Sequence, residues 1–252
     1  MTLVRLGVDR GIATITLDSP ANRNALSQRL LVELGQALAA TAGDEAVRGV
    51  VLTATGSTFC SGADLKDPPG QGAGAGVSMA EILEALWHFP KAVVARVNGH
   101  VRAGGIGLVA ATDIAVAPTS ATFAFTEVRI GVAPAIIAVV CGRRMEPRSF
   151  WRFALTGEQF DGAAAAAAGL LTTAVELDEL DGAVGALCDH IRQTEPGAVR
   201  ATKELLTRLP TLSLDDGFSW AEQVSRRLFS SPEAAEGITA FRERRPPSWA
   251  VS

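Results

Sequence analysis

The apolar positions in the first half of the chain follow two different periods. Residues 11–20 (GIATITLDSP) alternate like a β-strand and end at a Ser-Pro turn. Residues 25–42 carry leucines at every fourth position, which places them on one helix face. Further apolar strands are predicted at 49–56, 91–99 and 113–117, and a helix at 104–111. This alternation of strands and helices predicts an α/β core.

The pattern changes in the second half, where helices dominate. Within the first half, residues 68–77 (PPGQGAGAGV) favour a loop, and Ser78 with Glu81 three residues later predicts a capping box. One strand is predicted near residues 172–175. The predicted helices after Pro134 span residues 135–144, 147–156, 161–168, 178–193, 196–208, 213–229 and 232–244.

Composition narrows the function classes. A chain of 252 residues can bury a core without disulfides or metals, and a net charge of −4 argues against nucleic-acid binding as its main task. The three cysteines (Cys60, Cys141, Cys188) and three histidines show no disulfide framework or metal-ligand spacing. No apolar run suits a signal peptide or a membrane helix, so we expect a cytoplasmic protein with no membrane partner. The absence of tyrosine excludes phenol chemistry.

Three segments carry candidate chemistry: 59–66 (FCSGADLK), 98–108 (NGHVRAGGIGL) and 125–134 (FTEVRIGVAP). Glycines at strand ends let the backbone approach a ligand, and two free N–H groups from separate loops can form an oxyanion hole. Glu127 among apolar residues would have a raised pKa that suits proton transfer. Together these parts fit enolate chemistry on a thioester. Each segment alone also fits a plain reading: a turn, close helix–strand packing, or a surface carboxylate.

The sequence resembles the crotonase (enoyl-CoA hydratase/isomerase) superfamily over nearly its whole length. The resemblance rests on ITLDSPANRNALS (15–27), FCSGADLK, VNGHVRAGGIGLVAATDIAVA (97–117), FAFTEVRIGVAP (123–134), LTGEQFDGAAAAAAGLLTTAVELDEL (155–180) and SPEAAEGITAFRERRPPSW (231–249). It implies an α/β fold, a crotonase-type spiral of ββα units over residues 1–190, with a helical oligomerisation region at 191–252. It also implies a homo-trimer or a dimer of trimers, of which we expect the hexamer.

The resemblance also implies roles for single residues. The backbone N–H groups of Ala63 and Gly104 correspond to the oxyanion hole, and Glu127 to one of two catalytic glutamates. Gly107 stands where the other glutamate is expected. The substrate is expected to be an acyl-CoA thioester that binds near residues 21–25 and 61–66, with Arg23 and Lys66 toward its phosphates. Because the coenzyme A is part of the substrate, no separate cofactor is expected. The expected substrate-binding residues are Arg23, Ala25, Ser61, Asp64, Leu65, Lys66, Gly105 and Gly107.

The missing glutamate leaves three functions open. The chain could be an enoyl-CoA hydratase, a Δ3,Δ2-enoyl-CoA isomerase working with one carboxylate, or a non-catalytic acyl-CoA-binding protein. The combination of GGIGL with TEVRIGVAPAII resembles bacterial methylglutaconyl-CoA hydratase-like proteins, which favours the hydratase. Arg102 or Arg129 could neutralise an acidic acyl tail, although a surface or interface ion pair is the simpler reading.

Three other sequence features do not alter the predicted fold or function. His100 is expected to pack in the core, and Cys60 lacks the arrangement of a nucleophile with a base. Residues Met79, Ile82, Leu83 and Leu86 could line the acyl pocket or simply pack in the core. Within the family, the absence of tyrosine excludes the naphthoate synthases.

Overall fold

The computed structural model describes residues 2–66 and 76–251. Most of the Gly-rich loop predicted at 68–77 therefore falls outside the described residues. None of the described helices is both long and apolar enough to cross a membrane.

Two sheets form the centre of the molecule. The larger sheet has the order β1-β2-β3-β5-β7-β10, in which β1 is antiparallel to β2 and every other pair is parallel. Its strands are β1 (Val4–Asp9), β2 (Ile12–Leu17), β3 (Gly49–Ala54), β5 (Ala92–Arg96), β7 (Ile114–Pro118) and β10 (Thr173–Val175). The smaller sheet has the order β4-β6-β8-β9, with strands β4 (Thr58–Cys60), β6 (His100–Arg102), β8 (Thr122–Ala124) and β9 (Phe160–Asp161).

The chain repeats one supersecondary unit. Each unit gives one strand to the larger sheet, a short strand to the smaller sheet, and then a helix: β3-β4-α2, β5-β6-α3 and β7-β8-α4. Successive units place their strands side by side in both sheets, because β3, β5 and β7 are neighbours and so are β4, β6 and β8. The α/β spiral of ββα units is therefore confirmed.

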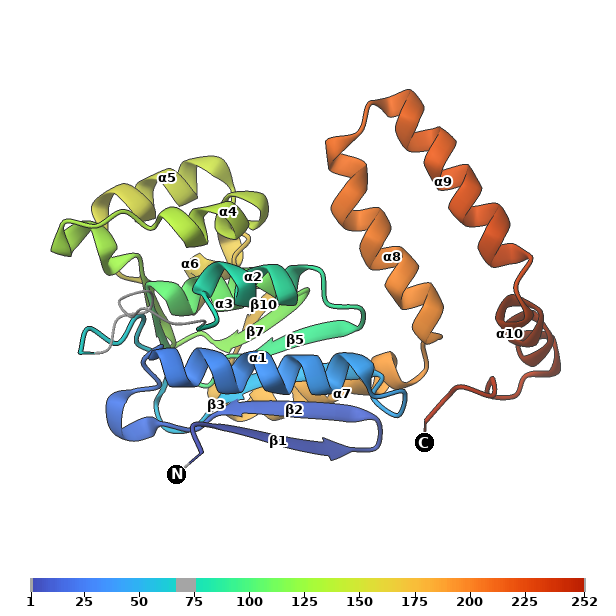
Figure 1. The fold of residues 1–252 in the computed structure, drawn as a ribbon, viewed down its shortest axis with the longest axis horizontal. Helices are drawn as coiled ribbons and strands as arrows, with labels where there is room; N and C mark the ends of the chain where they lie inside the picture. Colours follow the sequence, from blue (N-terminus) through green and yellow to red (C-terminus); the bar gives the residue numbers. More distant parts are fainter. Residues whose placement is uncertain (1, 67–75, 252) are drawn as a thin grey trace.

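Helices cover both faces of the larger sheet (Figure 1). Ala13, Ile15 and Leu52 point to one face and join the main core with α1, α2 and α3. The alternate positions Ile12 and Val51 point to the other face and pack against α7. The core helices are α1 (Gln28–Gly43), α2 (Met79–Trp87), α3 (Gly104–Ala111), α4 (Ala135–Arg144), α5 (Pro147–Thr156), α6 (Gly162–Ala167) and α7 (Leu180–Arg192).

The last three helices project away from this core (Figure 1). They are α8 (Pro196–Arg208), α9 (Leu214–Phe229) and α10 (Pro232–Glu243), and together we call them the C-terminal arm. Lys203 on α8 ties the arm to the core, because its ammonium group lies 2.6 Å from the Asp113 carboxylate. The tail after α10 returns to the end of α7, where the Val251 N–H donates to the carbonyl of Arg192.

Some elements differ from the predictions made from sequence. The N-terminal strand β1 and the short strands β4, β6, β8 and β9 were not predicted. The first predicted helix starts later, because Ser27 caps it and residues 20–26 form a 3₁₀ turn and loop. The packed-core prediction for His100 is wrong. Its side chain is exposed, and its Nδ1 forms a hydrogen bond of 2.9 Å with the Thr122 hydroxyl.

Candidate active site

The three predicted chemical segments leave the carboxyl ends of three neighbouring parallel strands. Ala63 follows β4, Gly104 follows β6 and Glu127 follows β8. Strand β6 pairs in parallel with both β4 and β8, so these ends share one edge of the smaller sheet. Neighbouring strands lie about 4.8 Å apart, which places the three groups within about 10 Å in the strand-to-strand direction. Such an edge is where open parallel sheets commonly bind ligands.

A tight turn presents the N–H of Ala63. Gly62 before it has a φ of +90°, which a residue with a side chain rarely adopts. A Cβ on Gly62 would lie 2.8 Å from the Cβ of Ala103, so the turn is pressed against the start of α3. The turn is held by Leu26, whose N–H donates to the Gly62 carbonyl and whose carbonyl accepts from Asp64. Among the described residues, the Ala63 N–H donates to no protein acceptor.

The N-terminus of α3 supplies the second donor. Ala103, which precedes the helix, has a φ of 48°, a strained value for a residue with a Cβ. A Cβ on Gly105 would lie 2.7 Å from the Cβ of Cys60, so glycine is required for this close approach to β4. The Gly104 N–H, like that of Ala63, has no acceptor within the described part of the chain. Two free N–H groups thus lie on touching segments, as an oxyanion hole requires.

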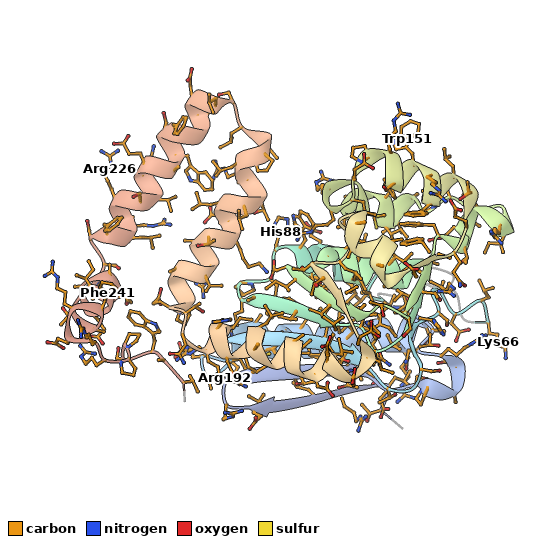
Figure 2. All side chains as sticks on the ribbon, turned by 180° about the vertical axis from the view of Figure 1, so that it is seen from behind. Lys66, His88, Trp151, Arg192, Arg226 and Phe241 are labelled. Carbon is orange, nitrogen blue, oxygen red and sulfur yellow. The ribbon has the colours of Figure 1, made fainter. Side chains whose placement is uncertain are left out.

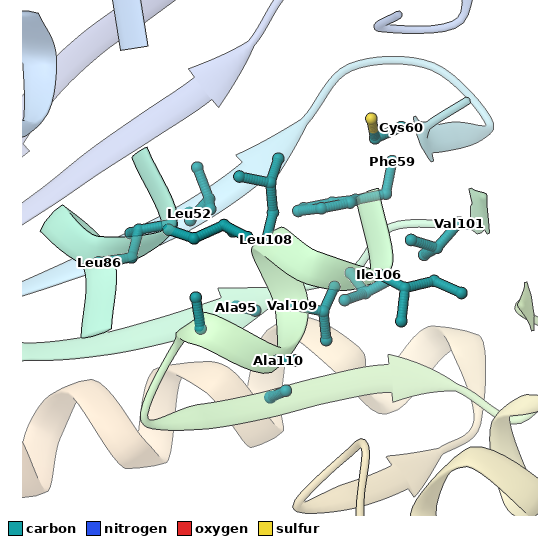
Figure 3. Close-up of a cluster of buried hydrophobic side chains, with 14 of the residues drawn as sticks. Leu52, Phe59, Cys60, Leu86, Ala95, Val101, Ile106, Leu108, Val109 and Ala110 are labelled. Carbon is teal, nitrogen blue, oxygen red and sulfur yellow. The ribbon is translucent and has the colours of Figure 1, made fainter. Parts of the chain in front are cut away.

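Helix α3 is held rigidly because it is buried on all sides. Figure 3 shows Ile106, Leu108 and Val109 pointing from it in different directions into the surrounding side chains. All three are at most 1% exposed. The position of the Gly104 N–H is therefore fixed by the packing of the whole core, and little reorganisation is needed when a charge develops beside it.

Glu127 supplies the carboxylate. It lies in a 3₁₀ turn, residues Thr126–Ile130, that follows β8 directly. The side chain is half-buried, and its Oε2 is buried without a hydrogen-bond partner. Burial raises the pKa of this carboxyl above its ordinary value. An unpartnered carboxylate with a raised pKa is suited to taking and returning a proton.

Helix α4 borders both Glu127 and Gly107. The charge of Glu127 adds to the effect of burial in raising the pKa of the Cys141 thiol on α4. One helical turn earlier, the Cγ2 of Ile137 would clash with a Cβ placed on Gly107. Leu83 Cδ1 lies 3.3 Å from that same point. The place expected for a second glutamate is therefore filled by apolar side chains.

The residues expected to bind coenzyme A lie on adjoining segments. The Ser61 N–H donates to the Arg23 carbonyl, which joins the 20–25 loop to the 61–66 turn. Ala25 is buried, whereas Arg23, Leu65 and Lys66 are exposed. Asp64 caps its own turn by accepting from the Lys66 N–H. Figure 2 shows Lys66 at the end of the core opposite the C-terminal arm.

Of the two arginines suggested for an acidic tail, Arg102 is occupied by hydrogen bonds within the protein. The guanidinium of Arg102 donates to the carbonyls of Val101 and Thr122 and to the Gln159 side chain. Arg129 lies against Gly157, on the side of α5, where its charge lowers the pKa of Glu158. The hydrogen bonds of Arg102 therefore favour a structural role for that residue.

The thiols are not placed for nucleophilic chemistry. All three cysteines are buried and free, and burial raises the pKa of the Cys60 thiol to about 12. The residues that sequence reasoning missed are Leu26, which holds the Ala63 turn, and Ile137, which covers Gly107. No local motif marks either of them, because both act through contacts with distant segments.

Comparison with known proteins agrees with this geometry. The family model of enoyl-CoA hydratase/isomerase matches residues 7–251. A Thermus thermophilus protein named "Putative enoyl-CoA hydratase" is 34% identical, over 95% of this chain and 98% of its own. The carnitinyl-CoA dehydratase of Proteus mirabilis is 30% identical over 94% of both chains. The crystal structure of an enoyl-CoA hydratase of Mycobacterium smegmatis superposes with a TM-score of 0.90, at 32% identity and 98% coverage of both chains. With the spiral of ββα units and the paired backbone donors, these matches show that the chain belongs to the enoyl-CoA hydratase/isomerase family of the crotonase superfamily.

Proposed function

We propose that this protein is an enoyl-CoA hydratase that adds water to a 2-enoyl-CoA thioester and forms a 3-hydroxyacyl-CoA. The observation that carries the proposal is the half-buried carboxylate of Glu127, with one unpartnered oxygen, at the same sheet edge as two free N–H donors. The family relatives named as a hydratase and a dehydratase support water addition or removal as the reaction class.

In this mechanism Glu127 serves as both base and acid. Its carboxylate takes a proton from water while the water oxygen forms a bond to C3 of the substrate. The π electrons move to the thioester oxygen, and the N–H groups of Ala63 and Gly104 stabilise the resulting enolate. The protonated Glu127 then gives its proton to C2, the carbonyl re-forms and the carboxylate is regenerated. One carboxylate thus balances the reaction without a second acid.

The experiment is a panel of enoyl-CoA thioesters, short, long, branched and acidic, assayed for both hydration and isomerisation. We expect loss of the conjugated 2-enoyl absorbance with formation of the 3-hydroxy product. Turnover of 3-enoyl-CoA to the conjugated isomer, without hydration, would overturn the proposal. Acyl-CoA binding with no turnover on any substrate would instead favour a binding protein.

The apolar filling at Gly107 favours one second candidate, the Δ3,Δ2-enoyl-CoA isomerase. Among the described residues, the atoms nearest to a Cβ on Gly107 belong to the apolar side chains of Ile137 and Leu83. An isomerase needs only one carboxylate to move a proton between C4 and C2. The hydratase stays the main proposal because the relatives named above are a hydratase and a dehydratase.

We also propose that the C-terminal arm, with the rest of residues 191–252, is an oligomerisation region. Phe218 and Phe229 on α9 are 70% and 75% exposed, although aromatic side chains of this size are normally buried. Apolar surface of this kind marks protein contacts, which supports a trimer or a dimer of trimers. A reducing compartment such as the cytoplasm is compatible with three buried free thiols.

A further inference from the structure

An apolar groove lies beside Gly107, because Leu83 lines the groove and also lies near Gly107. The groove has a volume of about 560 Å³ between α2 and α4 and is lined mainly by alkyl and aromatic side chains. Ile136 and Val139 form its outer wall and are 48% and 58% exposed. Leu83 forms part of its inner wall.

Two buried side chains lie against Gly107, and one of them, Leu83, also lines the groove. Ile137 and Leu83 are each 3% exposed and meet in front of Gly107. Leu83 thus contacts the groove on one side and the Gly107 surface on the other. Both residues are almost fully buried, so among the described residues their side chains fill the space beside Gly107.

The position of Ile137 and Leu83 along the acyl chain follows from helix geometry. A thioester oxygen held by the Gly104 N–H fixes C1 of the acyl group at the start of α3. Gly107 is three residues farther along, which is about 4.5 Å of helix rise and the length of a few carbon–carbon bonds. Met79, whose Cε lies 3.8 Å from a Cβ placed on Gly104, and Leu83 one turn later line this path. An acyl chain that runs along α3 from this point would therefore reach Ile137 shortly after C3.

We propose that Ile137 is a specificity-determining residue that, with Leu83, restricts the enzyme to short-chain 2-enoyl thioesters by closing the reaction centre off from the groove. This inference rests on the proposed function for its substrate type. It adds the chain length, which neither the motif nor the family match contains. It also gives Gly107 a structural role, because the missing side chain leaves the space that Ile137 occupies.

The test compares kcat/KM for 2-enoyl-CoA thioesters of four, eight and twelve carbons. We expect the wild type to prefer the four-carbon substrate over the twelve-carbon one by at least tenfold. Ile137→Ala should reduce that preference at least tenfold, because it joins the groove to the reaction centre. Ile136→Ala is the matched control: it shortens a neighbouring groove residue that does not touch Gly107, and should leave the preference unchanged.

Two further measurements keep the outcome decisive. Ile137→Val, which removes one methyl group, should shift the preference in the same direction by less, and it tests the idea if Ile137→Ala does not fold. Calorimetric binding of butanoyl-CoA and dodecanoyl-CoA should show the same length limit without turnover. A length limit in binding with no hydration would refute the proposed function and leave this inference standing. Equal hydration of all lengths by the wild type, or an unchanged preference in the Ile137 variants, would overturn the inference alone.

Discussion

Glu127 lies where burial destabilises its charged form and no hydrogen bond to Oε2 offsets that cost. Its carboxylate is half-buried, its Oε2 has no partner, and burial raises its pKa. A purely structural glutamate would normally gain a hydrogen bond or ion pair in exchange for burial. The same local conditions that destabilise the carboxylate increase its tendency to accept a proton, which is the property that the proposed mechanism uses.

The first prediction concerns this carboxylate. Glu127→Gln should lower kcat for hydration by about 10²–10⁴-fold, because the amide can neither take the proton from water nor return it to C2. Binding of a saturated acyl-CoA, measured by calorimetry, should stay within a few-fold of the wild type. Glu84→Gln, which removes a carboxylate from the outer groove, is the control and should retain activity. Normal turnover by Glu127→Gln would show that another group moves the proton.

The second prediction is a pH dependence. The mechanism needs ionised Glu127, so kcat/KM should fall as the pH falls through the pKa of this group. Because burial raises that pKa, the acid limb should lie at a higher pH than an ordinary glutamate would give. The limb is measured from kcat/KM of the wild type over a pH series with crotonyl-CoA.

The pH dependence of the free energy of unfolding provides an independent check of the raised pKa of Glu127. The folded state holds the Glu127 proton more tightly than the unfolded state, so this group favours folding at low pH and that contribution is lost as pH rises through the raised pKa. The free energy of unfolding of the wild type should therefore fall relative to Glu127→Gln across this interval. A pH-independent difference between the two proteins would contradict the raised pKa.

Some residues of the candidate site can be predicted from the sequence, and others cannot. Ala63, Gly104 and Glu127 could be proposed from the sequence because their segments match motifs of the crotonase superfamily, and their catalytic roles stay predictions. Ile137 could not, because its role comes from packing against Gly107 thirty residues away in sequence. Arg102 could be noticed but not interpreted, since its bonds to Thr122 and Gln159 form only when the short strands pair.

At the scale of elements, α3 and α4 approach each other through glycine. The contact between Ile137 and Gly107 leaves no room for even one methyl group, whereas Gly142 on the exposed side of α4 has only an ordinary contact of 3.7 Å with Phe150. These two helical glycines therefore provide a matched pair for testing how closely the helices are packed.

The third prediction uses this pair. Gly107→Ala should destabilise the protein by about 1–3 kcal/mol, because the new Cβ would force Ile137 and α4 to move. Gly142→Ala should be neutral or stabilising by up to about 1 kcal/mol, because alanine has the higher helix propensity and fits the space. Both changes are measured by chemical denaturation. Equal effects at the two positions would show that α4 is free to shift away from α3.

Long helices could be predicted from the sequence, whereas the shortest strands could not. Helices such as α4, α5 and α8 begin and end where the periodic pattern begins and ends, because several turns of apolar residues define each one. Strands β4, β6 and β8 have three residues each, too few to show a period. They exist because neighbouring units of the spiral pair with one another, and they determine where the candidate catalytic groups meet.

At the scale of the whole molecule, the exposed apolar surface is unevenly distributed. The arm carries Leu206, Phe218 and Phe229 at 70% exposure or more, and Trp151 projects from α5 of the core (Figure 2). A chain with apolar patches on both its arm and its core can associate head to tail with further copies and close into a ring.

The fourth prediction follows from that surface. Light scattering should give the wild type as a hexamer, with a trimer as the alternative assembly. The double variant Phe218→Glu and Phe229→Glu should lower the mass, because burying carboxylates in place of aromatic rings opposes association. Val8→Glu makes the same kind of change on the edge strand β1, where the side chain is 51% exposed, and should leave the mass unchanged. A monomeric wild type would refute the oligomerisation role of the arm.

Because the chain returns to α7 after the C-terminal arm, both ends of the arm are fixed at the same place. The Val251 N–H bonds to the Arg192 carbonyl and the Trp249 indole N–H to the Gln193 carbonyl, so the arm leaves and re-enters the molecule at one place. Thermodynamically it is a large closed loop, and the entropy of closing a loop rises only with the logarithm of its length. Helical turns can therefore be added to or removed from α9 at little entropic expense, while removal of the Trp249 and Val251 contacts would release the whole arm at one end.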